Sequence, residues 1–446
     1  MRRFALDNMG QWFTSKGRRP LVVRGARQVG KSTLVRMFAA ENHLDLLEIN
    51  LERHLYLDQV FEGLNPATIL SRIEEATGRH LTPKTLLFLD EIQATPHAFG
   101  ALRYFYEDRP DLPVVAAGSL LELALPKIEF SMPVGRIEYF HLGACTFPEF
   151  LVAADAKELH QRLREYRVGE EWSEVLDRRC AQYYADFLAV GGMPAALASF
   201  IDEPQNTAAW RQAQQRIMDT YQDDFAKYRS HGDWAAILQQ VYRRLPGQVG
   251  RKVKYTELAP GERVEKIHQA VDMLIAARVV MRASHVAPPT QPLAAHASAK
   301  VYKTYWVDGG LVRLDPAMAA EQFVAQHLAY GAGPMIGSEL YYWLREGKTE
   351  NAEVDFVINI EADSGTARTS EVIPLEVKSG ATGKIRSLRL YIEKYKPHRA
   401  VRFHAGLPAQ EKILATHLIT LPVYMAPYLN AILGALVSPI SASSQT

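Results

Sequence analysis

Short apolar runs alternate with amphipathic segments along the first part of the chain. The apolar runs lie at 20–25, 44–52, 85–93 and 112–121. Their aliphatic and β-branched residues favour buried strands, whereas segments such as 66–78 and 99–109 space apolar residues as a helix does. This alternation predicts a parallel sheet covered by helices on both faces, and thus an α/β domain over residues 1–157.

From residue 158 the pattern becomes helical and aromatic, with a Gly-Gly-Met-Pro break at 191–194. Within 253–284 a short helix, a turn, a longer helix and an apolar strand follow in order, which suits a winged helix, and 301–314 returns as a strand. A unit of order αβββαβ begins near Asp315. We therefore expect a helical region at 158–230, a winged-helix-like domain at 231–314, an αβββαβ domain at 315–436 and a disordered tail at 437–446.

Composition agrees with a multidomain globular protein. The 446 residues are 48% hydrophobic and 23% charged, and the length suggests about three domains. A net charge of +1 removes overall basicity as an argument for nucleic-acid binding, but a local basic patch can still bind it. Two cysteines, Cys145 and Cys180, argue against a disulfide framework and a zinc site. With neither a secretion signal nor a transmembrane run, we expect a cytoplasmic protein without a membrane partner.

The clearest chemical motif is GARQVGKS, which follows a predicted strand and opens a predicted helix. Gly25, Gly30, Lys31 and Ser32 have the spacing of a phosphate-binding loop. Lys31 would reach the β and γ phosphates, Ser32 would bind Mg²⁺, and the loop N–H groups would surround phosphate oxygens. We therefore expect ATP to bind through Gly25, Ala26, Arg27, Gln28, Val29, Gly30, Lys31, Ser32 and Thr33.

Further parts of a nucleotide site are predicted where the apolar run LLFLDEIQ ends in two acids. Asp90 would hold Mg²⁺, and Glu91 would orient the attacking water, unless both are simply solvated acids at a strand end. Ser119 would contact the γ-phosphate or the water, although a plain strand end fits it equally well. Arg136 would contact a nucleotide in its own or a neighbouring subunit, and Arg27 would contact phosphate. For both arginines a solvated surface position is the alternative.

A second charged site is predicted in IPLEVKSG, which sets two opposite charges into a β-branched run. Residues two apart share one face of a strand, so Glu376 and Lys378 point together. A neighbouring strand carrying Asp355 would add a carboxylate, and two close carboxylates repel unless a cation lies between them. Mg²⁺ or Mn²⁺ held by Asp355 and Glu376 would activate water. Lys378 would stabilise negative charge, Glu321 would orient or share the site, and a cross-strand salt bridge is the alternative.

The order of these motifs resembles a known family over nearly the full chain, namely bacterial and archaeal AAA-type ATPases with a C-terminal domain of unknown function. The resemblance rests on GARQVGKST, LFLDEIQ, GSLL, PVGRIEYFHL, FPEF, GGMPAAL, YWVDGGLV, EQFVAQHL, YYWLRE, EVDFVI and PLEVKSG. It implies an AAA-like P-loop NTPase domain, a winged-helix region and a C-terminal nuclease-like domain of the PD-(D/E)XK type. It also implies ATPase roles for Lys31, Ser32, Asp90 and Glu91, and nuclease-like positions for Glu321, Asp355, Glu376 and Lys378.

Three functions are consistent with these motifs. We favour a Mg²⁺-dependent ATPase that acts on nucleic acid. The second is a nucleotide-controlled signalling switch, in which ATP changes the oligomeric state and the terminal domain binds a partner without cleaving it. The third is an active metal-dependent DNase for which the ATPase is a sensor. The expected ligands are ATP and Mg²⁺, with Mn²⁺ as an alternative at the second site, and the candidate partners are DNA and further copies of the chain.

Overall fold

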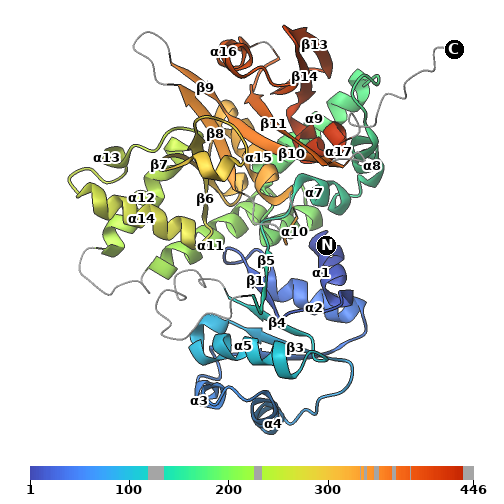
Figure 1. Ribbon diagram of the computed structural model, residues 1–446, viewed down its shortest axis with the longest axis vertical. Coiled ribbons are helices and arrows are strands. Elements are labelled where there is room, and N and C mark those ends of the chain that lie inside the picture. Colours follow the sequence, from blue (N-terminus) through green and yellow to red (C-terminus); the bar gives the residue numbers. More distant parts are fainter. Residues whose placement is uncertain are drawn as a thin grey trace, which may run out of the picture.

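The computed structural model describes residues 1–118, 135–225, 234–331, 333–335, 339–345, 351–363, 368–381 and 383–434. Figure 1 shows the N-terminal sheet at the bottom, the C-terminal strands at the top and most of the middle helices between them. One cluster of buried apolar residues extends from Leu6 in α1 (Ala5–Thr14) to Leu433 in α17 (Leu429–Gly434). The N-terminal, middle and C-terminal parts therefore share one core.

The N-terminal sheet is fully parallel, with the strand order β2-β3-β4-β1-β5. Its strands are β1 (Leu21–Arg24), β2 (Asp45–Asn50), β3 (Thr85–Asp90), β4 (Val114–Ala117) and β5 (Glu138–His141). The predicted parallel sheet is confirmed. The sequence did not predict β5, because only one of its four residues is fully buried and its apolar pattern is weak.

Helices cover both faces of this sheet, as predicted. They are α1, α2 (Lys31–Glu41), α3 (Leu57–Glu62), α4 (Pro66–Thr77) and α5 (Pro96–Asp108). Along β3, Leu86 and Phe88 pack with α1 and α2, whereas Leu87 and Leu89 pack with α3, α4 and α5. The two-residue period of the strand thus divides its side chains between two helical layers.

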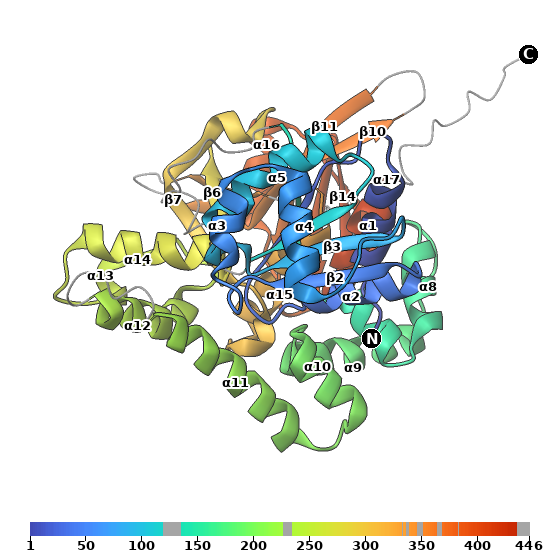
Figure 2. The same ribbon diagram turned by 90° about the horizontal axis from the view of Figure 1, so that it is seen from below.

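The middle region is helical. Its helices are α7 (Phe147–Ala153), α8 (Lys157–Glu165), α9 (Glu174–Val190), α10 (Pro194–Asp202), α11 (Thr207–Phe225) and α12 (Trp234–Arg244). The predicted Gly-Gly-Met-Pro break separates α9 from α10, because Gly191 leaves the helical conformation and Pro194 opens the next helix. Figure 2 shows α11 as one long helix that runs between α10 and α12.

The segment after α12 has the predicted order of helices and strand. It contains α13 (Tyr255–Leu258), α14 (Val264–Ala276) and the antiparallel pair β6 (Val280–Val286) and β7 (Ala297–Trp306). The strand predicted over 301–314 ends early, at Trp306. Gly309 and Gly310 begin a short 3-10 helix instead, so the chain turns away from the sheet.

The C-terminal part begins with the predicted αβββαβ order, in which one strand is divided, and continues with two further strands and a short helix. It comprises α15 (Pro316–Gly331), β8 (Leu340–Arg345), β9 (Ala352–Val354), β10 (Phe356–Asp363), β11 (Arg368–Val377), α16 (Arg386–Tyr395), β12 (Arg399–His404), β13 (Ala409–Ile413), β14 (Thr416–Pro422) and α17. The strand expected over 352–361 is interrupted at Asp355. As a result β9 pairs with β8, whereas β10 pairs with β11 in another sheet.

Two sheets organise this part of the molecule. One has the order β10-β11-β12-β14-β13, and the other has the order β7-β6-β8-β9. In the second sheet β6 pairs in parallel with β8, so strands on both sides of residue 314 share one sheet. The domain limits stated above remain predictions. In the part of the chain that the structure describes, no helix is long and apolar enough to cross a membrane.

Candidate nucleotide site and a second charged site

The predicted phosphate loop joins the carboxyl end of β1 to the start of α2, the position in which helix N–H groups bind anions. Gly30 caps α2 with φ 92°, and Gln28 also has a positive φ of 64°. Gly25 lies so close to the Leu142 carbonyl that a Cβ would come within 2.2 Å of its oxygen. A glycine is required there because a side chain would displace the loop from β5.

The polar groups at the bottom of the loop are brought together as the motifs predict. The Lys31 ammonium donates to the carbonyl oxygens of Gly25 and Ala26, both at 2.9 Å. The Ser32 hydroxyl donates to Asp90 Oδ2 at 2.8 Å. Burial raises the pKa of Asp90, and the Ser32 hydrogen bond opposes that shift. A hydroxyl and a carboxylate at this separation suit Mg²⁺ bound beside a phosphate.

Glu91 lies beside this pair in a left-handed conformation, with φ 54° and ψ 46°. Its carboxylate accepts a hydrogen bond of 2.5 Å from the side-chain amide of Gln93, a residue that sequence analysis did not single out. Gln93 also borders Gly118 at the end of β4, where a Cβ would lie 2.4 Å from Gln93 Oε1. Gln93 thus positions Glu91 between β3 and β4. The predicted Ser119 lies outside the described residues.

Helix α11 contacts the outer side of the phosphate loop. The Tyr221 hydroxyl donates to the Arg27 carbonyl at 2.9 Å, and the Gln28 amide donates to Thr220 at 2.9 Å. The Arg27 guanidinium forms an ion pair with Asp224. Arg27 is therefore held by α11, and of the other predicted loop residues Val29 is buried and Thr33 is exposed.

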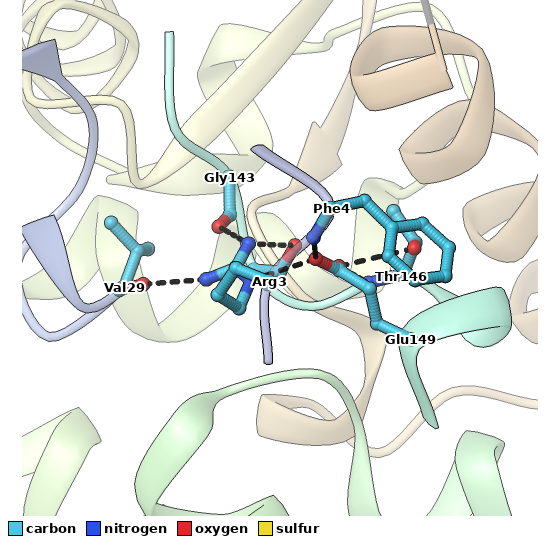
Figure 3. Close-up of polar contacts among 7 residues, drawn as sticks. Arg3, Phe4, Val29, Gly143, Thr146 and Glu149 are labelled. Atoms are coloured by element: carbon cyan, nitrogen blue, oxygen red, sulfur yellow. Dashed lines mark hydrogen bonds and ion pairs between the residues drawn. The ribbon is translucent and has the colours of Figure 1, made fainter. Parts of the chain in front are cut away.

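The N-terminus of the chain supports the loop from a third side (Figure 3). Arg3 is buried and donates to the Val29 carbonyl at 3.0 Å, to the Gly143 carbonyl at 3.0 Å and to Glu149 Oε1 at 2.9 Å. Glu149 also accepts from the backbone N–H of Phe4 and closes a capping box with the first residue before α7. One buried arginine thus joins the phosphate loop to β5 and α7.

We expect Arg3→Ala to lower the free energy of unfolding by about 3–5 kcal/mol, because it leaves the Glu149 carboxylate buried without its charge partner. Urea denaturation of the full chain measures this loss. Arg2→Ala is the matched control, since Arg2 pairs with Asp7 at the surface and should cost about 0–1 kcal/mol. Equal losses in the two variants would contradict a special role for the Arg3 network.

Arg136 lies away from the loop of its own chain. It precedes β5, whose first residue Glu138 pairs with Leu21 at the start of β1, whereas the phosphate loop follows the end of β1. Its guanidinium donates to Glu107 Oε1 on α5 at 2.9 Å. Arg136 is therefore placed at the end of the strands opposite the phosphate loop of its own chain. A contact across subunits stays a prediction.

The residues predicted for the second site come together in the C-terminal part. Asp355, at the division between β9 and β10, accepts a 2.7 Å hydrogen bond from the Val377 N–H. On β11, Glu376 Oε1 lies 2.6 Å from the Lys378 ammonium. Because Phe356 pairs with Leu375, Asp355 and Glu376 occupy facing positions on neighbouring strands. Glu321 reaches the same place from α15.

A buried lysine that sequence analysis did not single out connects these acids. Lys303 on β7 has no solvent exposure, and its ammonium lies 3.0 Å from Glu321, 2.5 Å from Glu353 and 3.8 Å from Asp355. Glu321 also accepts a 2.6 Å hydrogen bond from the Tyr305 hydroxyl. The signal that could have identified Lys303 is the one used for IPLEVKSG, a charged residue inside the apolar strand VYKTYW.

Burial dominates the electrostatics of this cluster. It raises the pKa of Glu376 to about 8, with the charge of Asp355 adding to the shift and Lys378 opposing it. Burial also raises the pKa of Glu321 to about 7, although Lys303 opposes that shift. Burial disfavours the charged form of Lys303, but the carboxylates outweigh it, Glu321 most of all, and the Lys303 pKa is raised. The cluster therefore retains Lys303 and Lys378 as cations, and Glu321 and Glu376 bind protons near neutral pH.

The carboxylates leave one place suited to a divalent cation. Glu376 is buried, and its Oε2 has no hydrogen-bond partner among the described residues. Asp355 faces it, so the two could hold Mg²⁺ or Mn²⁺ through carboxylate oxygens. In the described residues no group of three or more acidic, histidine or cysteine side chains is arranged to hold a metal. A cation here would have to take its further ligands from water or substrate.

We expect the affinity of this site for Mn²⁺ to rise about tenfold per pH unit below pH 8, and then to level off. The folded-state pKa of Glu376 is raised from 4.5 to about 8, so its proton is retained below pH 8 and the cation must displace it. Electron paramagnetic resonance of free Mn²⁺ measures the affinity. Glu376→Gln should bind more weakly and lose the pH dependence, and a pH-independent affinity of the unaltered site would contradict the expectation.

Three models of protein families match the chain. An AAA domain matches residues 17–151, a domain of unknown function (DUF8612) matches residues 181–318, and a second domain of unknown function (DUF4143) matches residues 317–424. A search of curated proteins gave no match.

Several solved structures show partial similarity to the chain. The Walker-type ATPase of Pyrococcus abyssi has 14% identity and a TM-score of 0.42, over 70% of this chain and 94% of the other. The ORC1 protein of Aeropyrum pernix in complex with DNA has 12% identity and a TM-score of 0.26, over 72% and 91%. AMPPCP-bound DnaA of Aquifex aeolicus has 15% identity and a TM-score of 0.28, over 61% and 87%. These scores are too low to carry an argument about function.

The AAA-domain match covers the elements that build the nucleotide site. Residues 17–151 include the phosphate loop, the Asp90–Glu91 strand end and all five strands of the parallel sheet. The loop geometry, the Ser32–Asp90 hydrogen bond and the parallel sheet agree with this match. Residues 17–151 therefore match an AAA domain and have the sheet and phosphate loop of a P-loop nucleotide-binding fold.

Proposed function

We propose that the protein is a cytoplasmic, Mg²⁺-dependent ATPase that acts on DNA through a C-terminal nuclease-like site of the PD-(D/E)XK type. The observation that carries this proposal is the convergence of Glu321 from α15, Asp355 from the break between β9 and β10, and Glu376 and Lys378 from the end of β11. A buried set of two facing carboxylates with a neighbouring lysine suits cleavage of a phosphodiester better than a surface salt bridge would.

The chain's own residues have separate tasks in ATP hydrolysis. Lys31 leaves the carbonyls of Gly25 and Ala26 to bind the β and γ phosphates. Ser32 and Asp90 would hold Mg²⁺, which would neutralise phosphate charge. Glu91, oriented by Gln93, accepts a hydrogen bond from the attacking water and aligns it with the γ-phosphate.

The second site would act on a phosphodiester. Asp355 and Glu376 would hold Mg²⁺ or Mn²⁺, which polarises the phosphate and lowers the pKa of a bound water. Lys378, about one third exposed, can reach an incoming phosphate and stabilise the negative charge that develops on it. Asp355 is oriented by its hydrogen bond from the Val377 N–H.

Exposed basic residues beside the second site support DNA as the partner. Arg243 and Arg244 are exposed at the end of α12, and Arg251, Lys252 and Lys254 are exposed in the segment that joins α12 to α13. Gly250 in this segment lies against Glu321, since a Cβ there would come within 2.8 Å of Glu321 Oε2. Basic side chains next to the acids would bind the DNA backbone on either side of the scissile phosphate. The helix–helix–hairpin order of α13, α14, β6 and β7 also suits a winged helix.

DNA cleavage tests the proposal. Linear, circular and single-stranded DNA are incubated with the full chain and Mg²⁺ or Mn²⁺, with and without ATP. We expect metal-dependent cleavage whose rate changes with ATP. Absence of cleavage under every condition would overturn the nuclease part and leave the ATPase part standing.

A second candidate function is a nucleotide-controlled switch whose C-terminal part binds a partner without cleavage. The contacts of α11 with the phosphate loop favour it, because a nucleotide that moves Arg27 or Gln28 would also move Tyr221 or Thr220. Arg136 would then contact a nucleotide in a neighbouring subunit. Sedimentation with and without ATP tests this candidate, with Arg136→Ala as the variant that should not assemble.

A further inference from the structure

Lys303 is the most deeply buried charge of the second site, and it comes from outside the C-terminal part. It lies on β7 of the middle region and has no solvent exposure. Its ammonium contacts carboxylates from α15 and β9 and lies near Asp355. It also lies 5.0 Å from the centre of the Tyr342 ring on β8, so strands of two parts of the chain enclose it.

The acids of the cluster outnumber its resident cations. Its acids are Glu321, Glu353, Asp355 and Glu376, and its cations are Lys303 and Lys378. When all four carboxylates are ionised they exceed the two ammonium groups by two negative charges, which protons on Glu321 and Glu376, or one divalent cation bound in place of those protons, would neutralise. Glu376 Oε2, buried and without a hydrogen-bond partner among the described residues, marks where such a cation would bind.

We propose that Lys303 is a resident cation that takes the place of a second metal ion and limits the site to one divalent cation, held by Asp355 and Glu376. Lys303 neutralises Glu321 and Glu353 directly, so these two carboxylates are not free to bind metal. The part about the bound ion rests on the metal site proposed above, whereas the role of Lys303 as counter-ion rests on the contacts alone.

The surroundings of Lys303 keep it in place. Glu321 accepts a hydrogen bond from the Tyr305 hydroxyl, and the backbone at Gly250 packs against its carboxylate. The residues on either side of Lys303 in β7 are buried. The backbone of Lys303 also pairs with that of Lys252 in an isolated antiparallel β-bridge. A side chain enclosed on all these sides cannot withdraw to admit a metal ion unless β7 moves. Lys303 is thus a positioning residue, which fixes Glu321 and the number of ions.

Mn²⁺ binding tests the proposal. The full chain carries Ser32→Ala and is kept free of nucleotide, so that the phosphate loop contributes no site. Electron paramagnetic resonance gives the number of Mn²⁺ ions per chain, and a thermal melt gives the midpoint with and without Mn²⁺. We expect one ion in this parent and two after Lys303→Met, which should also melt lower without Mn²⁺ and recover with it. Lys300→Met, an exposed lysine of the same strand, should match the parent.

The outcomes separate this inference from the proposed function. One ion in both the parent and Lys303→Met, or two in the parent, would overturn the role of Lys303. No ion in the parent and one in Lys303→Met would support Lys303 as counter-ion and overturn the metal site proposed above. No ion in either protein would overturn both.

A second variant covers the case in which Lys303→Met does not fold. Adding Glu353→Gln removes one carboxylate and restores the charge count of the parent. We expect the double variant to melt at a higher temperature than Lys303→Met in the absence of Mn²⁺. A double variant that is no more stable than the single one would overturn the charge balance on which the inference rests.

Discussion

Replacing Lys31 by alanine should lower the turnover of ATP by about 100- to 1,000-fold, the loss typical when a donor to a transition-state oxygen is removed. The Lys31 ammonium is buried in the loop and donates to the carbonyls of Gly25 and Ala26, which it can exchange for phosphate oxygens. No other lysine lies in the loop. Phosphate release from ATP, measured with Mg²⁺ on the full chain, gives the rate.

Two further variants make this result specific. Lys16→Ala removes an exposed lysine near β1 and should leave the turnover of ATP unchanged. Glu91→Gln should lose turnover while ATP still binds, because Glu91 acts on the water and not on the phosphates. If Lys31→Ala retained the turnover of the unaltered protein, the assignment of the hydrolytic site to this loop would be wrong.

Replacing Lys378 by alanine should lower metal-dependent DNA cleavage by about 100-fold or more. The ammonium lies 2.6 Å from Glu376 and is the cation of the cluster that is partly exposed, so it is the one able to approach a phosphate. Its loss also removes the charge that opposes the raised pKa of Glu376. In Lys378→Ala the residual rate of cleavage should therefore begin to fall at a higher pH than in the unaltered protein.

Lys384→Ala is the control for that result, since Lys384 is exposed in the segment that follows β11. Its cleavage rate should equal that of the unaltered protein. Comparing rates with and without ATP in both proteins shows whether the N-terminal domain governs the second site. Cleavage that survives Lys378→Ala at full rate would assign the activity to another site.

The parts of the fold that sequence patterns predicted are those with strong local signals. The strands β1, β3 and β4 are apolar runs, because they are covered on both faces, and the phosphate loop has a fixed spacing of glycines and polar residues. The division at Asp355 was not visible, because the flanking residues Val354 and Phe356 are both apolar and buried. Only the pairing of strands shows that they belong to different sheets.

Contacts between residues far apart in the chain could not be predicted. The bond from Tyr221 to Arg27 spans 194 residues, and the bond from Phe4 to Glu149 spans 145. Nothing in the sequence links the two members of either pair, since a tyrosine on a helix or a glutamate at a helix start is ordinary by itself. Lys303 is different, because a lysine within an aromatic strand is unusual, and it could have been included in the second site from its sequence alone.

The sheet that joins β6 to β8 has a consequence for how such a chain can be rearranged in evolution. The matched families meet at residues 317–318, which would be a natural breakpoint for gene fusion. A foreign C-terminal segment joined there would bring β8 without its partner β6, and Glu321 without Lys303. Exchange at this point would therefore leave an uncompensated carboxylate inside the protein. We expect the two segments to be inherited as a pair.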